Sequence, residues 1–165
     1  MKYPEKVSKH IVGWIDNYLN KIKMKGFVVG VSGGIDSALT STLCAETGRN
    51  VLCIEMPINQ GKDQVSRSKK HIEWLKKKYP NVSSISISLD KTFDSFVDSV
   101  PKDKSPKNEL SLANTKSRLR MVTLYYFSAL KKYIVVGTGN KVEDFGIGFY
   151  TKYGDGGVDI SPIAD

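Results

Sequence analysis

Cysteine is scarce in this sequence, and long apolar runs are absent from it. The 165 residues contain only Cys44 and Cys53, which fall on an expected helix and an expected strand, so we expect buried thiols in a reducing compartment rather than a disulfide. No apolar segment approaches the roughly 20 residues that a membrane-spanning helix needs. The N-terminal residues lack the apolar core of a secretory signal. The sequence therefore predicts a cytoplasmic protein that does not enter a membrane.

Acidic residues are fewer than basic ones, and the formal net charge is +8. Such a charge is found in many nucleic-acid-binding proteins. Residues 62–78, however, hold seven basic side chains against two acidic ones, which predicts a single helix with a solvated basic face. We therefore expect no nucleic-acid partner. The proportion of hydrophobic residues, 40%, is ordinary for a globular protein, and residues 1–165 are expected to form one domain.

A glycine-rich loop follows the first expected strand. Residues 26–39 read Gly-Phe-Val-Val-Gly-Val-Ser-Gly-Gly-Ile-Asp-Ser-Ala-Leu, a pattern typical of a buried strand, a loop and the start of a helix. Because the free N–H groups of the loop and the positive end of the helix dipole meet at one place, the pattern predicts a phosphate-binding site. No lysine follows the glycines, which excludes the common G-x-x-x-x-G-K-[ST] nucleotide loop.

Asp36 lies at the start of that helix, beside the predicted phosphate site. A carboxylate and a phosphate repel each other, so an aspartate in this place indicates a divalent cation between the two. We therefore interpret Asp36 as a ligand of Mg²⁺. The alternative is that Asp36 only caps the helix and that Gly33 and Gly34 only form a turn.

Apolar periodicity predicts helices that alternate with strands along the chain. Helices are expected at residues 5–23, 35–47, 63–78, 91–99 and 109–132, strands at 26–31, 51–56, 82–89 and 133–136, and a mobile loop at 101–108. The alternation predicts an α/β fold, a doubly wound parallel sheet in strand order 3-2-1-4 with helices on both faces. In that order the first and fourth strands are neighbours, so the ligand site is expected outside their carboxyl ends.

A second glycine loop, Gly137–Glu143, leaves the fourth strand. Because both loops are expected at the same edge of the sheet, the carboxylate of Glu143 is predicted to reach the cation held by Asp36. Two carboxylates, phosphate oxygens and water would complete a magnesium shell. Taken alone, Glu143 would be interpreted as a surface residue after a turn.

The long helix at residues 109–132 carries polar side chains that a ligand site can use. Asn114 and Arg118 are four residues apart and share a face, whereas Arg120 is turned about 200° from Arg118. We therefore expect Arg118 to line the same pocket as Asn114 and Arg120 to point elsewhere. The alternative for either arginine is a solvated surface residue.

Residues 146–162 combine five glycines with three aromatic side chains, Phe149, Tyr150 and Tyr153. The segment is too rich in glycine for a helix, and its aromatic rings beside Lys152 and two aspartates are suited to stacking on a heteroaromatic ring and gripping ribose or phosphate. The alternative is a structural hairpin.

These motifs resemble those of a known family. Ser32–Ser37 resembles the S-G-G-x-D-S pyrophosphate loop of the ATP pyrophosphatases, and residues 114–121, 137–143 and 149–159 look like consecutive motifs of NAD synthetase. The resemblance implies an adenine-nucleotide-hydrolase-like fold and a carbon–nitrogen ligase. Such an enzyme uses Mg-ATP to amidate deamido-NAD (nicotinate adenine dinucleotide) to NAD through an adenylated carboxylate. AMP and pyrophosphate are the other products, and family members are homodimers.

The resemblance also implies roles for individual residues. ATP contacts fall on Gly30, Val31, Ser32, Gly33, Gly34, Ile35, Asp36, Ser37 and Thr138, and Mg²⁺ ligands on Asp36 and Glu143. Contacts to deamido-NAD fall on Asn114, Arg118, Phe149, Lys152, Asp155 and Asp159. No residue is expected to act as a nucleophile, because positioning two polyanions and stabilising charge on the transferring phosphorus can supply the rate.

Two departures from the family pattern bear on the function. The sequence has no glutaminase domain, so free ammonia is the expected nitrogen donor, and it ends at Asp165 without a further lysine-bearing motif and the helices that follow it in the family. We expect the chain to lack the family's C-terminal part. Two alternatives remain open: another ATP pyrophosphatase, such as a tRNA-modifying one, or a nucleotide-binding module without catalysis.

Overall fold

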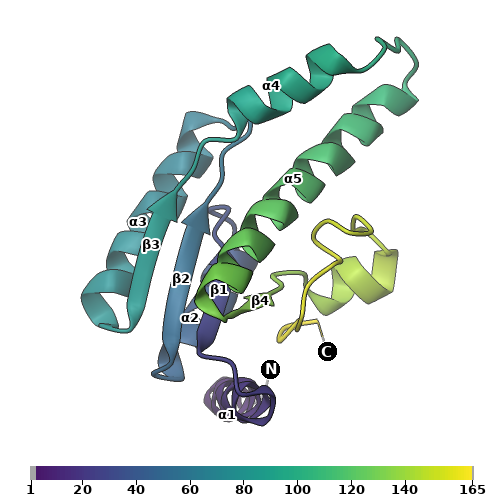
Figure 1. Cartoon of the computed structure of the whole chain (residues 1–165). Coiled ribbons are helices and arrows are strands. Elements are labelled where there is room, and N and C mark those ends of the chain that lie inside the picture. The colour runs from purple at the N-terminus through teal and green to yellow at the C-terminus, as the bar shows by residue number, and fades with distance from the viewer. Residues whose placement is uncertain (1–2, 165) are drawn as a thin grey trace.

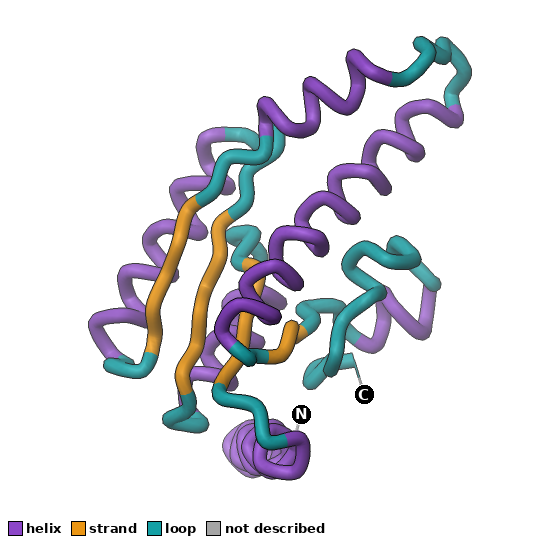
Figure 2. Tube along the Cα trace, in the orientation of Figure 1, coloured by secondary structure: helices purple, strands orange, loops and turns teal. Residues whose placement is uncertain are grey.

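A four-stranded parallel sheet forms the centre of the protein. The computed structural model describes residues 3–164 except for the side chain of Lys62; Met1, Lys2 and Asp165, which the expected single domain includes, lie outside the described residues. The strands are β1 (Gly26–Gly30), β2 (Asn50–Glu55), β3 (Val82–Ser86) and β4 (Ile134–Val136), in the order β3-β2-β1-β4 (Figures 1 and 2). All three strand pairs are parallel. The predicted fold class and strand order are therefore confirmed.

Helices cover both faces of this sheet. One face packs against α1 (Pro4–Ile22), α2 (Ile35–Glu46) and α3 (Lys62–Lys78), and the other against α4 (Asp90–Ser99) and α5 (Lys107–Lys131). Successive residues of β1 serve opposite cores, because Val29 belongs to the first cluster and Val28 to the second. Figure 1 shows α5 crossing one face of the sheet, with α4 and the N-terminal part of α5 projecting beyond it.

The limits of the elements lie within two residues of those expected, except at the end of β3. β3 ends at Ser86 rather than at Leu89, although the N–H groups of Ile87 and Leu89 still donate to the Glu55 and Pro57 carbonyls at 2.8 and 3.0 Å. β3 is an edge strand, as its alternating pattern predicts. None of the helices within residues 3–164 is long and apolar enough to cross a membrane.

The segment after β4 contains a short π-helical element, η1 (Val142–Ile147). Gly146 and Ile147 belong to a segment expected to be too rich in glycine for a helix, and this expectation is wrong for those two residues. The element begins where the Asn140 side chain accepts hydrogen bonds from the N–H groups of Val142 and Glu143. It ends at Gly148, whose φ of 74° is in the region that favours glycine.

The chain after η1 returns to the edge of the sheet. Ile160 forms an isolated parallel bridge with Val136, and the Gly137 N–H donates to the Ile160 carbonyl at 2.8 Å. Asp159 and Ile160 therefore lie beside β4 at the sheet edge, and the residues before them return from η1 past α5 (Figure 1).

Candidate functional site

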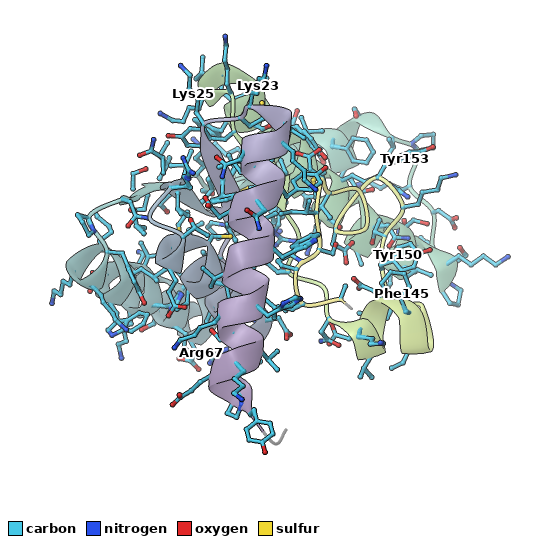
Figure 3. All side chains as sticks on the ribbon, turned by 90° about the horizontal axis from the view of Figure 1, so that it is seen from below. Lys23, Lys25, Arg67, Phe145, Tyr150 and Tyr153 are labelled. Carbon is cyan, nitrogen blue, oxygen red and sulfur yellow. The ribbon has the colours of Figure 1, made fainter. Side chains whose placement is uncertain are left out.

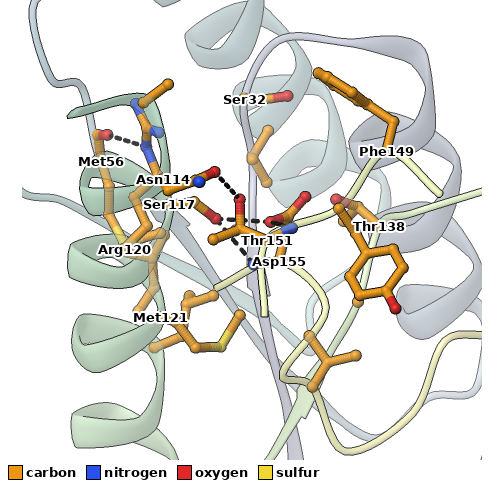
Figure 4. Close-up of a pocket in the computed structure, with 18 of the residues that line it drawn as sticks. Ser32, Met56, Asn114, Ser117, Arg120, Met121, Thr138, Phe149, Thr151 and Asp155 are labelled. Carbon is orange, nitrogen blue, oxygen red and sulfur yellow. Dashed lines mark hydrogen bonds between the residues drawn. The ribbon is translucent and has the colours of Figure 1, made fainter. Parts of the chain in front are cut away.

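A cavity of about 610 Å³ lies at the carboxyl ends of β1, β2 and β4, where the strand order predicts a ligand site. Its floor is formed by residues that end or follow these strands, one wall by α5, and the other by residues 148–158 (Figure 4). The lining residues include Gly30, Val31, Ser32, Met56, Gln60, Asn114, Ser117, Arg120, Thr138, Phe149, Thr151 and Asp155.

The loop after β1 is held by the hydroxyl groups of Ser32 and Ser37. The two oxygens lie 3.2 Å apart, the Gly34 N–H donates to Ser32 Oγ at 3.2 Å, and Ser37 Oγ donates to the Gly34 carbonyl at 3.0 Å. The first helical hydrogen bond of α2 comes from the Ala38 N–H, to the Gly34 carbonyl. The Ser32 and Gly34 N–H groups are taken up by the two hydroxyl groups, whereas those of Ile35, Asp36 and Ser37 have no partner within the helix and are available to an anion.

Gly33 brings the loop into contact with the start of α3. Its φ is +85°, and a Cβ built on it would lie 2.5 Å from the Gln64 carbonyl oxygen. Arg67 of α3 donates through Nε to the Gly33 carbonyl at 3.2 Å. The glycine is therefore required by both backbone conformation and close packing, and α3 supports the loop from outside the cavity.

Carboxylates from the two glycine loops act on the same acidic residue, Asp144. The pKa of Asp144 is raised by burial first, and then by the negative charges of Asp155, Glu143 and Asp36. Asp36 and Glu143 therefore lie within electrostatic range of the same carboxyl group. Within the described residues 3–164, no three Asp, Glu, His or Cys side chains come close enough to hold a metal ion by themselves.

The orientation of α5 differs from the expectation. Asn114 lines the cavity, but Arg120 lines it as well and Arg118 does not. The cavity takes in a wide face of the helix, on which Arg120 lies about 120° from Asn114 on the side opposite to Arg118. Arg118 is exposed and donates through Nε to the Lys152 carbonyl at 3.1 Å. The predicted placement of the two arginines is therefore wrong.

Hydrogen bonds fasten residues 151–159 to α5 at three positions, and the segment that they hold is called the strap below. Thr151 Oγ1 donates to Asn114 Oδ1 at 2.9 Å, and Ser117 Oγ donates to Asp155 Oδ1 at 2.7 Å (Figure 4). Farther along, the Tyr125 hydroxyl donates to Asp159 Oδ1 at 3.1 Å. The three partners on α5 are three and eight residues apart, so the strap is attached to the helix at two adjacent turns and again about two turns farther along.

Asp159 and Lys152 lie outside the cavity. Asp159 Oδ2 accepts a hydrogen bond from the Val135 N–H at 2.7 Å, so both its oxygens bond within the fold. Burial raises the pKa of Tyr125 to about 12, and the Asp159 charge and hydrogen bond add to this effect. Lys152 Nζ lies 5.0 Å from the centre of the Tyr153 ring, within the range of a cation–π contact.

Two of the three expected aromatic rings reach the cavity. Phe149 and Tyr150 line it, whereas Tyr153 does not. Figure 3 shows Phe145, Tyr150 and Tyr153 on the C-terminal side of the molecule. The rings expected to stack on a ligand are therefore divided between the cavity and the outside of the molecule.

Sequence reasoning missed several residues of the cavity wall. Met56 and Gln60 follow β2, and only their position after a strand could have indicated them. Ser117 and Met121 lie on α5 one helical turn apart, between Asn114 and Arg120 in angle, so a correct rotation of the helix would have included all four.

Comparisons with known proteins give a consistent result. Residues 7–165 match the family model described as NAD synthase. An NH(3)-dependent NAD(+) synthetase from Mycoplasma genitalium is 39% identical over 161 residues, which cover 96% of this chain and 62% of that protein. The chain thus spans about three fifths of the length of this curated relative.

Two solved structures share the fold over 98% of this chain. NMN synthetase from Francisella tularensis matches with a TM-score of 0.87 and 30% identity, over 65% of its own chain. NH3-dependent NAD synthetase from Campylobacter jejuni, in complex with the nitrate ion, matches with a TM-score of 0.86 and 31% identity, over 67% of its own chain.

Proposed function

The chain belongs to the NAD synthase family, and from this membership we propose that it amidates deamido-NAD to NAD with ATP and free ammonia. In this reaction a carboxylate oxygen of deamido-NAD attacks the α-phosphorus of ATP, and pyrophosphate leaves. Ammonia then attacks the carbonyl carbon of the adenylated carboxylate, and AMP leaves as the amide forms. The protein is then a carbon–nitrogen ligase with ATP as co-substrate.

One observation supports this proposal above the others: the loop Ser32–Ser37 opens into a cavity large enough for a nucleotide. Gly30, Val31 and Ser32 form part of the cavity wall, and Thr138 faces them from the loop after β4. A nucleotide in the cavity would therefore place its terminal phosphates at the free N–H groups of the loop and of the first turn of α2. We assign the ATP contacts to Gly30–Ser37 and Thr138.

We assign Mg²⁺ to Asp36 and Glu143. The two carboxylates come from different loops and lie within electrostatic range of Asp144, and neither makes an ion pair within the described residues. Two carboxylates are few for a metal ion held by protein alone, but they suit Mg²⁺, which takes most of its ligands from phosphate and water. When bound, the ion would neutralise charge on the phosphate oxygens.

We assign deamido-NAD to the region around the strap. Asn114, Phe149 and Asp155 line the cavity, whereas Arg118, Lys152 and Asp159 lie outside it. The dinucleotide would therefore extend from the cavity past the strap to the outer residues. No side chain is assigned as a nucleophile, since binding the two reactants in register removes most of the entropic barrier.

We further propose that the protein is a cytoplasmic homodimer. Both cysteines are unpaired and buried, as is usual in a reducing compartment. Apolar side chains on the outer side of α5 remain exposed, and a second copy could cover them next to the outer substrate residues. We propose that the chain forms one domain.

The test is incubation of the chain with Mg-ATP, ammonium and deamido-NAD. We expect NAD, AMP and pyrophosphate to appear in equal amounts. Nicotinate mononucleotide, offered in place of deamido-NAD, should be a poorer substrate. Pyrophosphate release that requires tRNA instead of deamido-NAD would contradict the proposal and favour another ATP pyrophosphatase. ATP binding in calorimetry without turnover would favour a non-catalytic nucleotide-binding module.

A further inference from the structure

Arg120 is the only positively charged side chain among the described residues that line the cavity. The one negatively charged residue there, Asp155, is already engaged, because its Oδ1 accepts hydrogen bonds from Ser117 Oγ and the Thr151 N–H at 2.7 and 2.9 Å. Among the side chains that the structure describes, the only ion pair joins Arg49 to Asp16. Arg120 therefore faces the cavity without a carboxylate partner.

The guanidinium of Arg120 is fixed along one edge. Its Nε donates to the Met56 carbonyl at 3.1 Å (Figure 4), and Met56 packs near Gly30, where a Cβ would lie 3.3 Å from Met56 Cε. The backbone that follows β2 thus orients the planar group beside the end of β1. No acceptor within the described residues bonds to the two terminal nitrogens of the Arg120 guanidinium. These two nitrogens form the outer edge of the planar group and are available to a ligand.

Burial makes this arrangement unfavourable without a ligand. Burial lowers the pKa of Arg120, and the Asp155 charge only partly opposes this effect. Arginine nevertheless stays protonated in proteins, so the charge persists at a desolvation cost that one carbonyl contact offsets poorly. An anion bound to the two terminal nitrogens would supply the missing partner.

We propose that Arg120 binds the phosphate nearest to the nucleoside when an adenine nucleotide occupies the cavity. The inference rests on the proposed function in that the ligand is an adenine nucleotide. Arg120 and the loop Ser32–Ser37 reach the ligand region from different elements, α5 and the β1–α2 connection. A nucleotide with its terminal phosphates on the loop therefore has its first phosphate within the cavity, where the fork can bind two of its oxygens.

The experiment compares two ligands that differ only in the phosphate, AMP and adenosine, by isothermal titration with the unaltered chain and with Arg120→Gln. We expect Arg120→Gln to weaken AMP binding about 10- to 100-fold, as for a lost bidentate charge-assisted contact, and adenosine binding less than about 2-fold. Lys131→Gln is the matched control, because it removes the same charge from an exposed site on the same helix. It should leave both affinities unchanged.

Three outcomes would overturn the assignment. Equal losses for AMP and adenosine would mean that Arg120 only supports the backbone at Met56. A loss confined to deamido-NAD relative to NAD, with AMP unaffected, would assign the guanidinium to the nicotinate carboxylate instead. Failure of the unaltered chain to bind AMP would overturn both this assignment and the proposed function, whereas AMP binding without amidation would count against the proposed function only.

A second variant keeps the test decisive if Arg120→Gln does not fold. Arg120→Lys retains the charge but not the planar fork, so we expect an intermediate loss for AMP and none for adenosine. AMP affinity equal to that of the unaltered chain would contradict the bidentate contact. Adenosine binding in each variant also reports that the cavity is intact.

Discussion

At the scale of single residues, the site depends on a few positions where geometry leaves little choice. Gly33 is the clearest, because its positive φ and its closeness to the Gln64 carbonyl both exclude a side chain. Among the charged residues, Asp36 is the one assigned to the metal ion, and no cation among the described residues pairs with its carboxylate. The first determines whether the loop forms, and the second what the loop can bind.

We expect Gly33→Ala to destabilise the protein more than Gly48→Ala does. Both glycines have positive φ, but a Cβ at Gly48 meets nothing within 4 Å, whereas at Gly33 it lies 2.5 Å from a backbone oxygen. Gly48→Ala should lower the free energy of unfolding in urea by about 1–2 kcal/mol, the conformational penalty alone. Gly33→Ala should lower it by about twice as much or more. Equal losses would mean that α3 moves aside without strain.

We expect Asp36→Asn to lower turnover about a hundredfold or more while leaving metal-free ATP binding nearly unchanged. The amide keeps the shape of the side chain but removes the charge assigned to Mg²⁺. Steady-state rates at increasing Mg²⁺, together with calorimetry in EDTA, check both parts. Asp98→Asn, on the exposed face of α4, is the control. Magnesium-dependent activity within a few fold of the unaltered chain would show that Asp36 does not hold the ion.

At the scale of elements, the contact between α2 and α3 supports the loop Ser32–Ser37. Ser41 of α2 donates to the Ser37 carbonyl at 2.7 Å and lies 2.9 Å from His71 Nε2 of α3. The His71 ring also stacks on Trp74. A change of charge at His71 therefore acts on the packing of the two helices that position the loop.

This contact predicts a pH dependence of stability. Burial lowers the pKa of His71 below its usual 6.5, so the folded state binds fewer protons than the unfolded state and stability rises with pH. We expect the free energy of unfolding to be constant above about pH 7.5 and to fall as the pH drops through the usual imidazole pKa to the lower folded value.

The variant His71→Gln tests the assignment of this pH dependence. Glutamine can still hydrogen-bond to Ser41 but does not titrate, so urea unfolding of the variant between about pH 7.5 and about pH 5 should show a smaller decrease in stability. A decrease as steep as that of the unaltered chain would assign the effect to other groups.

At the scale of the whole molecule, α5 has one side against the sheet and cavity and an outer side with exposed apolar residues. Val122, Tyr126 and Leu130 follow one another at four-residue spacing and are 68%, 63% and 65% exposed. A contiguous apolar stripe of this kind is typical of an interface, and α1 adds the half-exposed Trp14. These residues are the basis for the proposed homodimer.

We expect sedimentation velocity to show a dimer for the unaltered chain and a monomer for the double variant Tyr126→Glu/Leu130→Glu. Two negative charges on each copy would be brought together and desolvated in the interface, which opposes association. The matched control is Phe96→Glu on α4, which is 40% exposed and away from the stripe. A dimer that survives the double variant would place the interface elsewhere.

The sequence by itself determined the strands, the α-helices, their parallel arrangement and the position of the loop Ser32–Ser37. Apolar periodicity is a local property, and it located the strands from Val28 to Val136 and the helices between them. Parallel wiring then required the loops at Ser32 and Gly137 to meet at one edge, because the carboxyl ends of parallel strands lie together. The expected cavity position therefore needed no tertiary information.

Only the tertiary structure decided which side chains face the cavity. Periodicity gives the angle between Asn114, Arg118 and Arg120, but the rotation of α5 about its axis is set by how Met121 and Leu124 pack on the sheet. That packing turns Arg120 inward and leaves Arg118 on the outside. Likewise, both oxygens of Asp159 bond within the fold because the Tyr125 hydroxyl and the Val135 N–H lie within hydrogen-bonding distance. These contacts join segments that are distant in the sequence, so the local pattern of residues could not predict them.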